Sequence, residues 1–158
     1  MRKLILSIAA AALATASFTS LSPAFAHKHK PQGHVFTITT KTLAETPHDG
    51  PPTLGDVSVI TEDAYRGSKK VGTSDLSCTM VRLDLAKHFF AAQCFNTTVL
   101  PEGQITSQGY VTSDQIEKVP FEQAITGGTG AYRNAHGVLT VDEAGDGPAH
   151  LTFDLTRG

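Results

Sequence analysis

Residues 124–137 of this chain run AITGGTGAYRNAHG, with four glycines among the eleven positions from 127 to 137. Glycine adopts positive φ and lets another backbone approach closely, so the segment predicts a compact turn across the end of a barrel. Tyr132 can then close the opening, and Arg133 can reach nearby carboxylates or carbonyls. A phosphate-binding loop is the competing interpretation, but no Gly-Lys-Ser/Thr or strand–turn–long-helix pattern supports it. Most of these residues are expected to shape the fold.

On both sides of this segment, from His34 onward, runs rich in β-branched residues alternate with turns of Gly, Pro and Asp. This pattern is typical of an all-β meander. From residue 27 onward no stretch shows a helical period over three turns. The expected strands are residues 34–40, 55–63, 70–83, 88–100, 104–112, 119–126, 136–142 and 149–156.

Successive strands with short links form either an up-and-down barrel or a sandwich. Nearly every link here is short enough for a hairpin between sequence neighbours, whereas a Greek-key sandwich needs at least one long crossing connection. Closure also removes the two exposed strand edges of an open meander. We therefore predict an all-β fold, an eight-stranded antiparallel up-and-down β-barrel.

Cys78 and Cys94 are the two cysteines of the chain. If the third and fourth strands turn about Ala86, these residues, eight positions before and after it, face each other. Directly opposed antiparallel residues have Cα atoms about 4.5–5.5 Å apart, within reach of a disulfide. A redox-active pair is disfavoured because the spacing is not Cys-x-x-Cys. Two thiols alone are also too few for a structural zinc site.

The first 26 residues have the pattern of a secretory signal, with a basic start, an apolar run over 4–14 and Ala24-Phe25-Ala26 as a cleavage site. The apolar run is too short to cross a hydrocarbon layer of about 30 Å. We expect a secreted protein with no membrane anchor. The expected division is a signal peptide at 1–26, a flexible mature N-terminus at 27–33 and a barrel domain at 34–158.

Cleavage after Ala26 would remove two of the 13 basic residues and none of the 15 acidic ones, which changes the formal charge from −2 to −4. A mildly acidic surface gives no reason to expect a nucleic-acid partner.

The glycine segment resembles the Gly-Gly-Thr-Gly-x-(Phe/Tyr)-Arg-x-Ala-x-Gly signature of the dirigent and allene oxide cyclase barrel superfamily. The resemblance extends over residues 35–155. It implies an eight-stranded barrel with an apolar interior open at one end. Relatives use such an interior to hold a small hydrophobic molecule and to steer its cyclisation or coupling, without a metal or organic cofactor. Further positions that agree in order with the first half of that family are Gly55-Asp56, Gly67 and Val71-Gly72. The positions that look similar to bacterial secreted members with an allene oxide cyclase-like barrel are Cys78, Cys94, Leu100-Pro101-x-Gly103, Ile105 and Gly109.

Some polar positions differ from the family pattern. Where dirigent proteins carry paired acids in the second strand, this chain has Thr61 and Glu62, and Thr73 replaces their arginine. Their Ala-Arg-Gly corresponds to residues 135–137, where His136 is the central residue. The catalytic signature of the plant cyclases in the first strand has no clear counterpart.

The candidate catalytic residues are Glu62, Arg133 and His136, and the candidate ligand-binding residues are Tyr110 and Tyr132. His136 could act as an acid or base near neutral pH, and Arg133 could hold an anionic or carbonyl oxygen. The alternative, which we favour, is that His136 caps a strand and Arg133 pairs structurally with Asp56 or Glu62.

Two further patterns are weaker. His27 and His29 would open the mature chain, and an amino-terminal amine with imidazoles can chelate Cu(II), although a solvated leader is the plainer interpretation. Asn96-Thr97-Thr98 fits the N-glycosylation pattern.

The expected function is that of a secreted barrel that binds a small hydrophobic molecule, either as a cofactor-independent cyclase or isomerase or as a dirigent-like steering protein. The alternative is a non-catalytic exported structural or interaction module that retains only the barrel. The sequence leaves open whether the protein is an enzyme. It predicts no cofactor, and since dirigent relatives are often oligomers, it allows an oligomer without identifying an interface.

Overall fold

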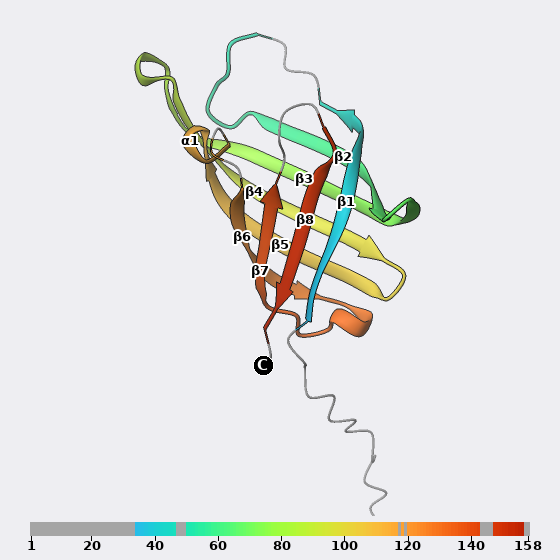
Figure 1. The fold of residues 1–158 in the computed structure, drawn as a ribbon. Coiled ribbons are helices and arrows are strands. Elements are labelled where there is room, and N and C mark those ends of the chain that lie inside the picture. Colours follow the sequence, from blue (N-terminus) through green and yellow to red (C-terminus); the bar gives the residue numbers. More distant parts are fainter. Residues whose placement is uncertain (1–33, 47–49, 117, 119, 143–146, 157–158) are drawn as a thin grey trace, which may run out of the picture.

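A closed barrel of eight antiparallel strands in chain order forms the computed structural model (Figure 1), which describes residues 34–46, 50–116, 118, 120–142 and 147–156. This confirms the predicted fold class. The strands are β1 (His34–Glu45), β2 (Val57–Arg66), β3 (Lys69–Asp84), β4 (Phe89–Leu100), β5 (Gly103–Thr112), β6 (Phe121–Gly128), β7 (Gly137–Asp142) and β8 (Ala149–Leu155).

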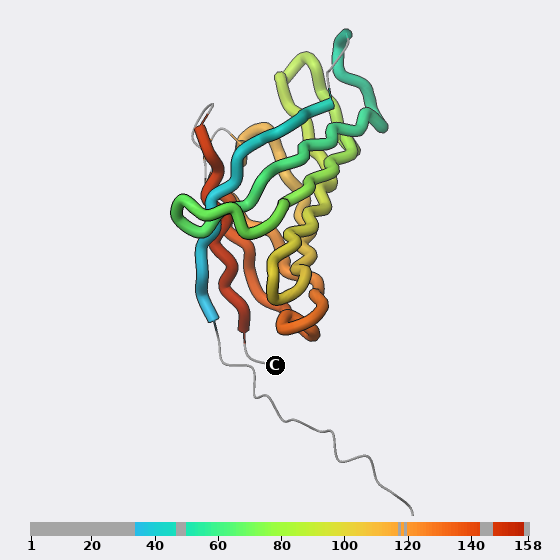
Figure 2. Tube along the Cα trace, turned by 90° about the vertical axis from the view of Figure 1, so that its right-hand side faces the viewer, coloured from blue at the N-terminus to red at the C-terminus, as the bar shows by residue number. Residues whose placement is uncertain are grey.

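The first and last strands close the barrel by pairing along most of their length. His34 faces Leu155 at one end of this pair, and Thr40 faces Ala149 at the other. The two strands lie side by side in Figures 1 and 2. β1 runs five residues beyond its predicted end at Thr40, because it continues to pair with β2 through a bulge between Thr42 and Ala44.

Short helical turns occupy three of the links. They are η1 (Leu85–Lys87), α1 (Ser113–Ile116) and η2 (Gly130–Tyr132). η1 forms the turn between β3 and β4 that was centred on Ala86. Asp84 caps it by accepting a hydrogen bond from Lys87 N, and His88 ends it in the left-handed region, with φ 51°.

The predicted disulfide is confirmed. Cys78 and Cys94 are direct partners in the β3–β4 ladder and are bonded, with Cα atoms 4.0 Å apart. The hairpin keeps the predicted register as far as Met80, where a bulge before Arg82 shifts it by one residue.

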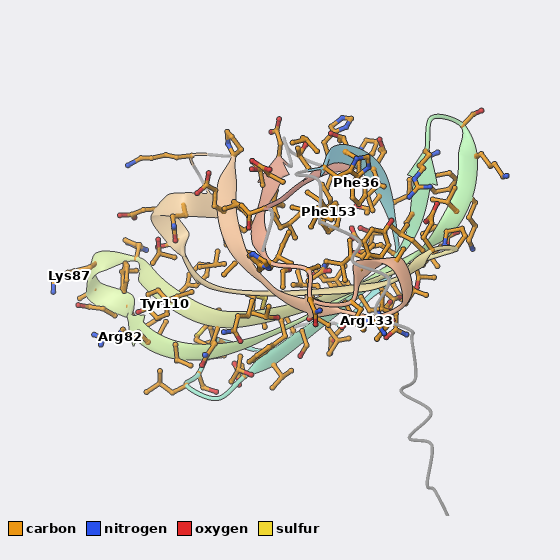
Figure 3. The ribbon with its side chains drawn as sticks, turned by 90° about the horizontal axis from the view of Figure 1, so that it is seen from below. Phe36, Arg82, Lys87, Tyr110, Arg133 and Phe153 are labelled. Atoms are coloured by element: carbon orange, nitrogen blue, oxygen red, sulfur yellow. A yellow bond between two sulfur atoms is a disulfide. The ribbon has the colours of Figure 1, made fainter. Side chains whose placement is uncertain are left out.

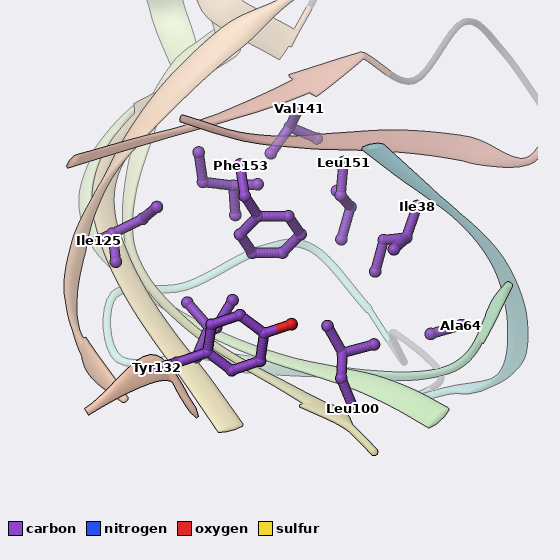
Figure 4. Close-up of a cluster of buried hydrophobic side chains, with 10 residues drawn as sticks. Ile38, Ala64, Leu100, Ile125, Tyr132, Val141, Leu151 and Phe153 are labelled. Carbon is purple, nitrogen blue, oxygen red and sulfur yellow. The ribbon is translucent and has the colours of Figure 1, made fainter. Parts of the chain in front are cut away.

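One end of the barrel, called the closed end below, is formed by the β2–β3 hairpin, the β4–β5 hairpin and η2. The larger apolar cluster fills the interior at and near this end, where Phe153 and Ile38 are 1% exposed and Leu139 is 0% exposed. Tyr132 points into this cluster from η2, towards Phe153 on the opposite wall (Figure 4). The other members of the cluster are Ala64, Leu100, Ile105, Ile125, Val141 and Leu151.

The glycine segment forms the predicted turn across the closed end. Gly130 has φ +60°, and a Cβ there would lie 2.4 Å from the carbonyl oxygen of Glu102 in the β4–β5 turn. Ala131 N donates to that same oxygen at 2.8 Å. Only glycine allows the two turns to approach this closely, so the segment and the β4–β5 turn form one unit.

The predicted signal peptide at 1–26, the leader at 27–33 and the copper-chelating candidates His27 and His29 lie outside the described residues. Among the residues that the structure describes, no helix is long and apolar enough to cross a membrane.

Candidate functional site

Seven polar side chains point into the barrel between the larger apolar cluster and a smaller one. We call them the interior polar set. Strand alternation places them on the same inward faces as core residues such as Ile38, Ala64 and Cys94. Six of them are between 0% and 7% exposed, and Glu62 is partly exposed. The set comes from six neighbouring strands and consists of Thr40, Glu62, Ser74, Asn96, Thr98, Ser107 and Gln123.

The centre of the interior polar set is a hydrogen-bonded group on β3 and β4. Asn96 Nδ2 donates to Ser74 Oγ at 3.0 Å, and Asn96 Oδ1 accepts from Thr98 Oγ1 at 3.1 Å. Ser74 Oγ also lies 3.2 Å from Thr98 Oγ1. Buried polar groups stabilise a fold only when they are satisfied in this way, so the group has a fixed geometry.

Two pairs flank this group. On one side Thr40 Oγ1 donates to Glu62 Oε1 at 2.9 Å, which directs the carboxylate inward. On the other side Ser107 Oγ donates to Gln123 Oε1 at 2.9 Å. The set therefore combines hydroxyls, two amides and one carboxylate on a single inner surface.

The end opposite η2 is called the open end below. Inward positions of β2 and β3 there are partly exposed, as at Ile60, Leu76, Cys78 and Met80, whereas Ala92, Cys94 and Val111 on β4 and β5 at the same end are buried. Inward positions near the closed end, such as Leu139, are fully covered. The interior polar set lies at the boundary between these two parts of the interior.

The disulfide lies at this open end and faces inward. Cys94 packs with Ala92 and Val111 in the smaller apolar cluster, which partly buried Cys78, Leu76 and Phe121 complete. The bond therefore joins two strands and also forms part of the apolar surface beside the interior polar set.

At the closed end, Arg66 and Glu102 form an ion pair that also holds Tyr132. The guanidinium of Arg66 contacts the two Glu102 oxygens at 2.6 and 3.1 Å, and the Tyr132 hydroxyl lies 3.4 Å from both partners. Hydrogen bonding to Arg66 lowers the pKa of Glu102, and the same contact raises the pKa of Arg66. Burial raises the pKa of Tyr132. This arrangement ties η2 to the β2–β3 and β4–β5 hairpins.

The sequence candidates occupy different parts of the molecule. Glu62 faces the interior, and Tyr132 lies at the closed end with 9% of its surface exposed. Tyr110 is 50% exposed and projects from the opposite face of β5 to inward Val111. Arg133 lies at the closed end, far from Tyr110 (Figure 3).

His136 and Arg133 are both exposed residues of the segment that follows η2. His136 Nδ1 lies 3.0 Å from the carbonyl oxygen of Asn134. The arginine that contacts Tyr132 is Arg66 on β2.

Sequence reasoning did not select Ser74, Asn96, Ser107 or Gln123. Their signal was present, because each occupies an inward position of its strand, two residues from an apolar inward residue. Asn96 had been considered only as a glycosylation acceptor, yet its side chain is 7% exposed and hydrogen-bonded inside the barrel. A glycan on this side chain is incompatible with the closed barrel.

A separate groove of about 620 Å³ lies on the outer wall beside α1. Its lining includes exposed Glu122 and Lys118, with Phe121 between the groove and the smaller apolar cluster. Within the described part of the chain, no group of three or more His, Cys, Asp or Glu side chains is arranged to hold a metal ion.

Comparison with known proteins adds a family to this geometry. A family model described as the allene oxide cyclase barrel like domain matches residues 35–148. No curated protein sequence matches the chain.

Solved structures show the same architecture. A pyocyanin demethylase is 27% identical, with a TM-score of 0.68 over 78% of this chain and 100% of that protein. An exo-specific intermolecular Diels-Alderase is 13% identical, with a TM-score of 0.61 over 79% and 98%. A pterocarpan synthase dirigent protein is 19% identical, with a TM-score of 0.52 over 90% and 96%. The last two show a shared fold.

Proposed function

We propose a function for this chain, which belongs to the allene oxide cyclase barrel-like family. The protein binds a small, largely apolar organic molecule inside the barrel at the open end and steers the conversion of that molecule. The conversion needs no metal or organic cofactor in this proposal. The observation that carries it is the interior polar set, placed between the covered apolar cluster and the partly exposed inward positions of β2 and β3.

The chemistry available at this place is positioning plus one carboxylate. Apolar walls around Leu76 and the disulfide would hold the ligand body, and the hydrogen-bonded polar groups would fix its orientation. Glu62, directed inward by Thr40, could then accept a proton or stabilise positive charge that develops on the ligand. Glu62 is the residue that we propose as catalytic.

The names of the similar structures support a small organic substrate. The 27% identical protein is named a demethylase of pyocyanin, and the more distant ones are named a Diels-Alderase and a pterocarpan synthase. Each name describes the conversion of a small organic molecule by a barrel of this architecture.

We further propose that the protein acts outside the cytoplasm. The disulfide between Cys78 and Cys94 persists in an oxidising compartment. The signal pattern in residues 1–26 is consistent with export to such a compartment.

The second candidate function is a non-catalytic exported module. Its support is that Arg133 and His136, two of the three candidate catalytic residues, are exposed outside the interior. A barrel that had lost its catalytic groups would keep the covered core and the disulfide and would convert no ligand.

The test is ligand binding by the full mature chain. Thermal shift and equilibrium dialysis would be measured with pyocyanin and with a panel of aromatic and terpenoid compounds. The interior-filling variant Leu76→Trp should abolish binding, whereas Ser77→Trp, the next residue on the outer face of β3, should not. Equal binding by both variants would place the ligand elsewhere, and no binding by the wild type to any compound would favour the non-catalytic module.

Catalysis is tested separately. For a ligand that the wild type converts, Glu62→Gln should keep binding within a few-fold and lower the turnover rate by about 10²-fold or more, the usual contribution of a positioned acid or base. Unchanged turnover would remove Glu62 from the proposed role and leave the binding proposal standing.

A further inference from the structure

Gln123 is a buried amide whose carbonyl oxygen is held by the protein and whose amide nitrogen is not. We propose that this nitrogen selects the ligand by donating a hydrogen bond to an uncharged acceptor, either a carbonyl oxygen or an aromatic ring nitrogen. The inference rests on the proposed function, because it assumes that a ligand enters the barrel.

The orientation of the amide follows from the one side-chain hydrogen bond that it makes among the described residues. Ser107 Oγ donates to Gln123 Oε1 at 2.9 Å, and both residues are at most 4% exposed. With Oε1 turned to β5, the two N–H groups of Nε2 point away from that bond. The serine therefore positions the donor.

The amide nitrogen is within reach of water although the residue is buried. Among the described residues, one buried side-chain atom, Asp63 Oδ1, has no hydrogen-bond partner. This atom forms an ion pair with Lys70 instead. Gln123 Nε2 has no protein acceptor there and is not such an atom, so part of its surface is accessible to solvent. A buried donor left without any partner would cost about 1–3 kcal/mol, which makes water or a ligand its natural partner.

The facing strand leaves room for this side chain. A Cβ added to Gly109 would lie 2.8 Å from Gln123 Cγ, closer than real contacts allow. The β5–β6 ladder also ends at the pair Gln108 and Ala124, so the two strands separate where Gln123 lies. The glycine on β5 and the end of the ladder together accommodate the side chain of Gln123.

The surroundings define the class of acceptor. The direct partner of Gln123 on β7 is Leu139, and Gly109 faces Cys94 of the disulfide. These neighbours are uncharged, and burying an ionised group among them would be costly. An uncharged oxygen or ring nitrogen on a flat apolar body fits an N–H donor beside Leu139, Val111 and the disulfide.

The experiment uses two probes of nearly the same shape, fluorenone with a carbonyl oxygen and fluorene without one. Dissociation constants would be measured by equilibrium dialysis on the full mature chain. We expect the wild type to bind fluorenone at least tenfold more tightly than fluorene. Gln123→Met and Gln123→Leu, which both remove the donor, should lose this preference by weakening the binding of fluorenone alone.

Two further variants complete the design. Gln108→Met makes the same change on the outer face of β5 and should behave as the wild type. Gly109→Ala keeps the amide of Gln123 but displaces it. This variant should therefore weaken the binding of fluorenone without affecting the binding of fluorene. It serves as the test should either Gln123 variant fail to fold.

The outcomes separate the two proposals. If the wild type binds neither probe, both the interior site for flat apolar molecules and the role of Gln123 are overturned. If the wild type binds both probes equally, or if the Gln123 variants retain the preference for fluorenone, the role of Gln123 is overturned and the binding proposal stands. A preference lost in the Gln123 variants and kept in Gln108→Met supports the inference.

Discussion

Arg66 on β2 and Glu102 in the β4–β5 turn are 36 residues apart in sequence and meet through two hydrogen bonds, of 2.6 and 3.1 Å, at the closed end. Their side chains are 38% and 41% exposed, so solvent weakens the attraction. The pair also contacts the hydroxyl of Tyr132, which connects three turns of the barrel. Its contribution to stability is therefore modest and depends on pH.

Replacing Glu102 should lower stability at neutral pH and not in acid. Glu102→Gln should lower the free energy of unfolding by about 0.2–1 kcal/mol at about pH 7, the usual range for an exposed ion pair. Because the pKa of Glu102 is lowered from its ordinary value of 4.5 in the folded protein, the contribution is complete above 4.5 and is lost as pH falls through the lowered value. Urea unfolding should be measured at about pH 7 and at about pH 3. The difference in the free energy of unfolding between variant and wild type should be smaller at the lower pH. Glu122→Gln on the outer wall is the control, and a difference that grows in acid would contradict this account.

Two glycines with nearly equal backbone angles allow a test of the close approach at the closed end. Gly67 has φ +61° and open space around its Cα, whereas Gly130 has φ +60° and lies against Glu102 O. Gly67→Ala should cost about 1–2 kcal/mol, the penalty of a side chain in the left-handed region. Gly130→Ala should cost about 1–3 kcal/mol more because of the added steric conflict. Equal losses in chemical denaturation would show that the β4–β5 turn can move away from η2 freely.

Removing the disulfide should destabilise the barrel without changing its topology. The bond closes a loop with a sequence separation of 16, for which loop entropy gives about 3 kcal/mol. The double variant Cys78→Ala/Cys94→Ala should lose about this amount in urea unfolding. Dithiothreitol should bring the wild type to the stability of the variant and leave the variant unchanged. A reductant effect on the variant would point to a cause other than this bond.

Truncating one phenylalanine in the interior and one on the outer wall should have very different effects on stability. Phe153 is 1% exposed and stacks on Phe36 with ring centroids 4.9 Å apart, whereas Phe95 is 53% exposed on β4. Phe153→Ala should cost about 3–5 kcal/mol through lost burial and the cavity that remains. Phe95→Ala should change stability by about 0.5 kcal/mol or less if the outer wall of β4 is uncovered in solution. A large loss for Phe95→Ala that depends on protein concentration would instead show that another subunit covers this wall.

The strands, their order and the barrel class could be predicted because their signals are local. Alternating β-branched residues and turns of Gly, Pro and Asp mark each strand, and short links favour pairing between neighbours. The Cys78–Cys94 pair was predicted from a turn centred on Ala86. The pairs next to η1 follow a register that differs by one residue, and the bulge between Met80 and Arg82 restores the register that aligns the two cysteines. The glycine turn at 127–137 could be predicted for the same reason, because positive φ is a property of the residue itself.

The candidate site could be predicted only in part. Glu62 was selected, but strand alternation has a period of two and defines two faces without stating which is inward. Bulges such as the one between Thr106 and Ser107 also change which residues meet on neighbouring strands. The place of Gln123, beside Ser107 and opposite Gly109, depends on such details.

By itself the sequence determined what short-range chemistry controls: the approximate positions of the strands, where the chain turns, and which cysteines pair. Only the tertiary structure decided that Arg66 rather than Arg133 contacts Tyr132, and that Asn96 lies inside the barrel. The physical reason is that these contacts join residues far apart in the chain. Their geometry is set by how eight strands close on one another, and no single segment carries that information.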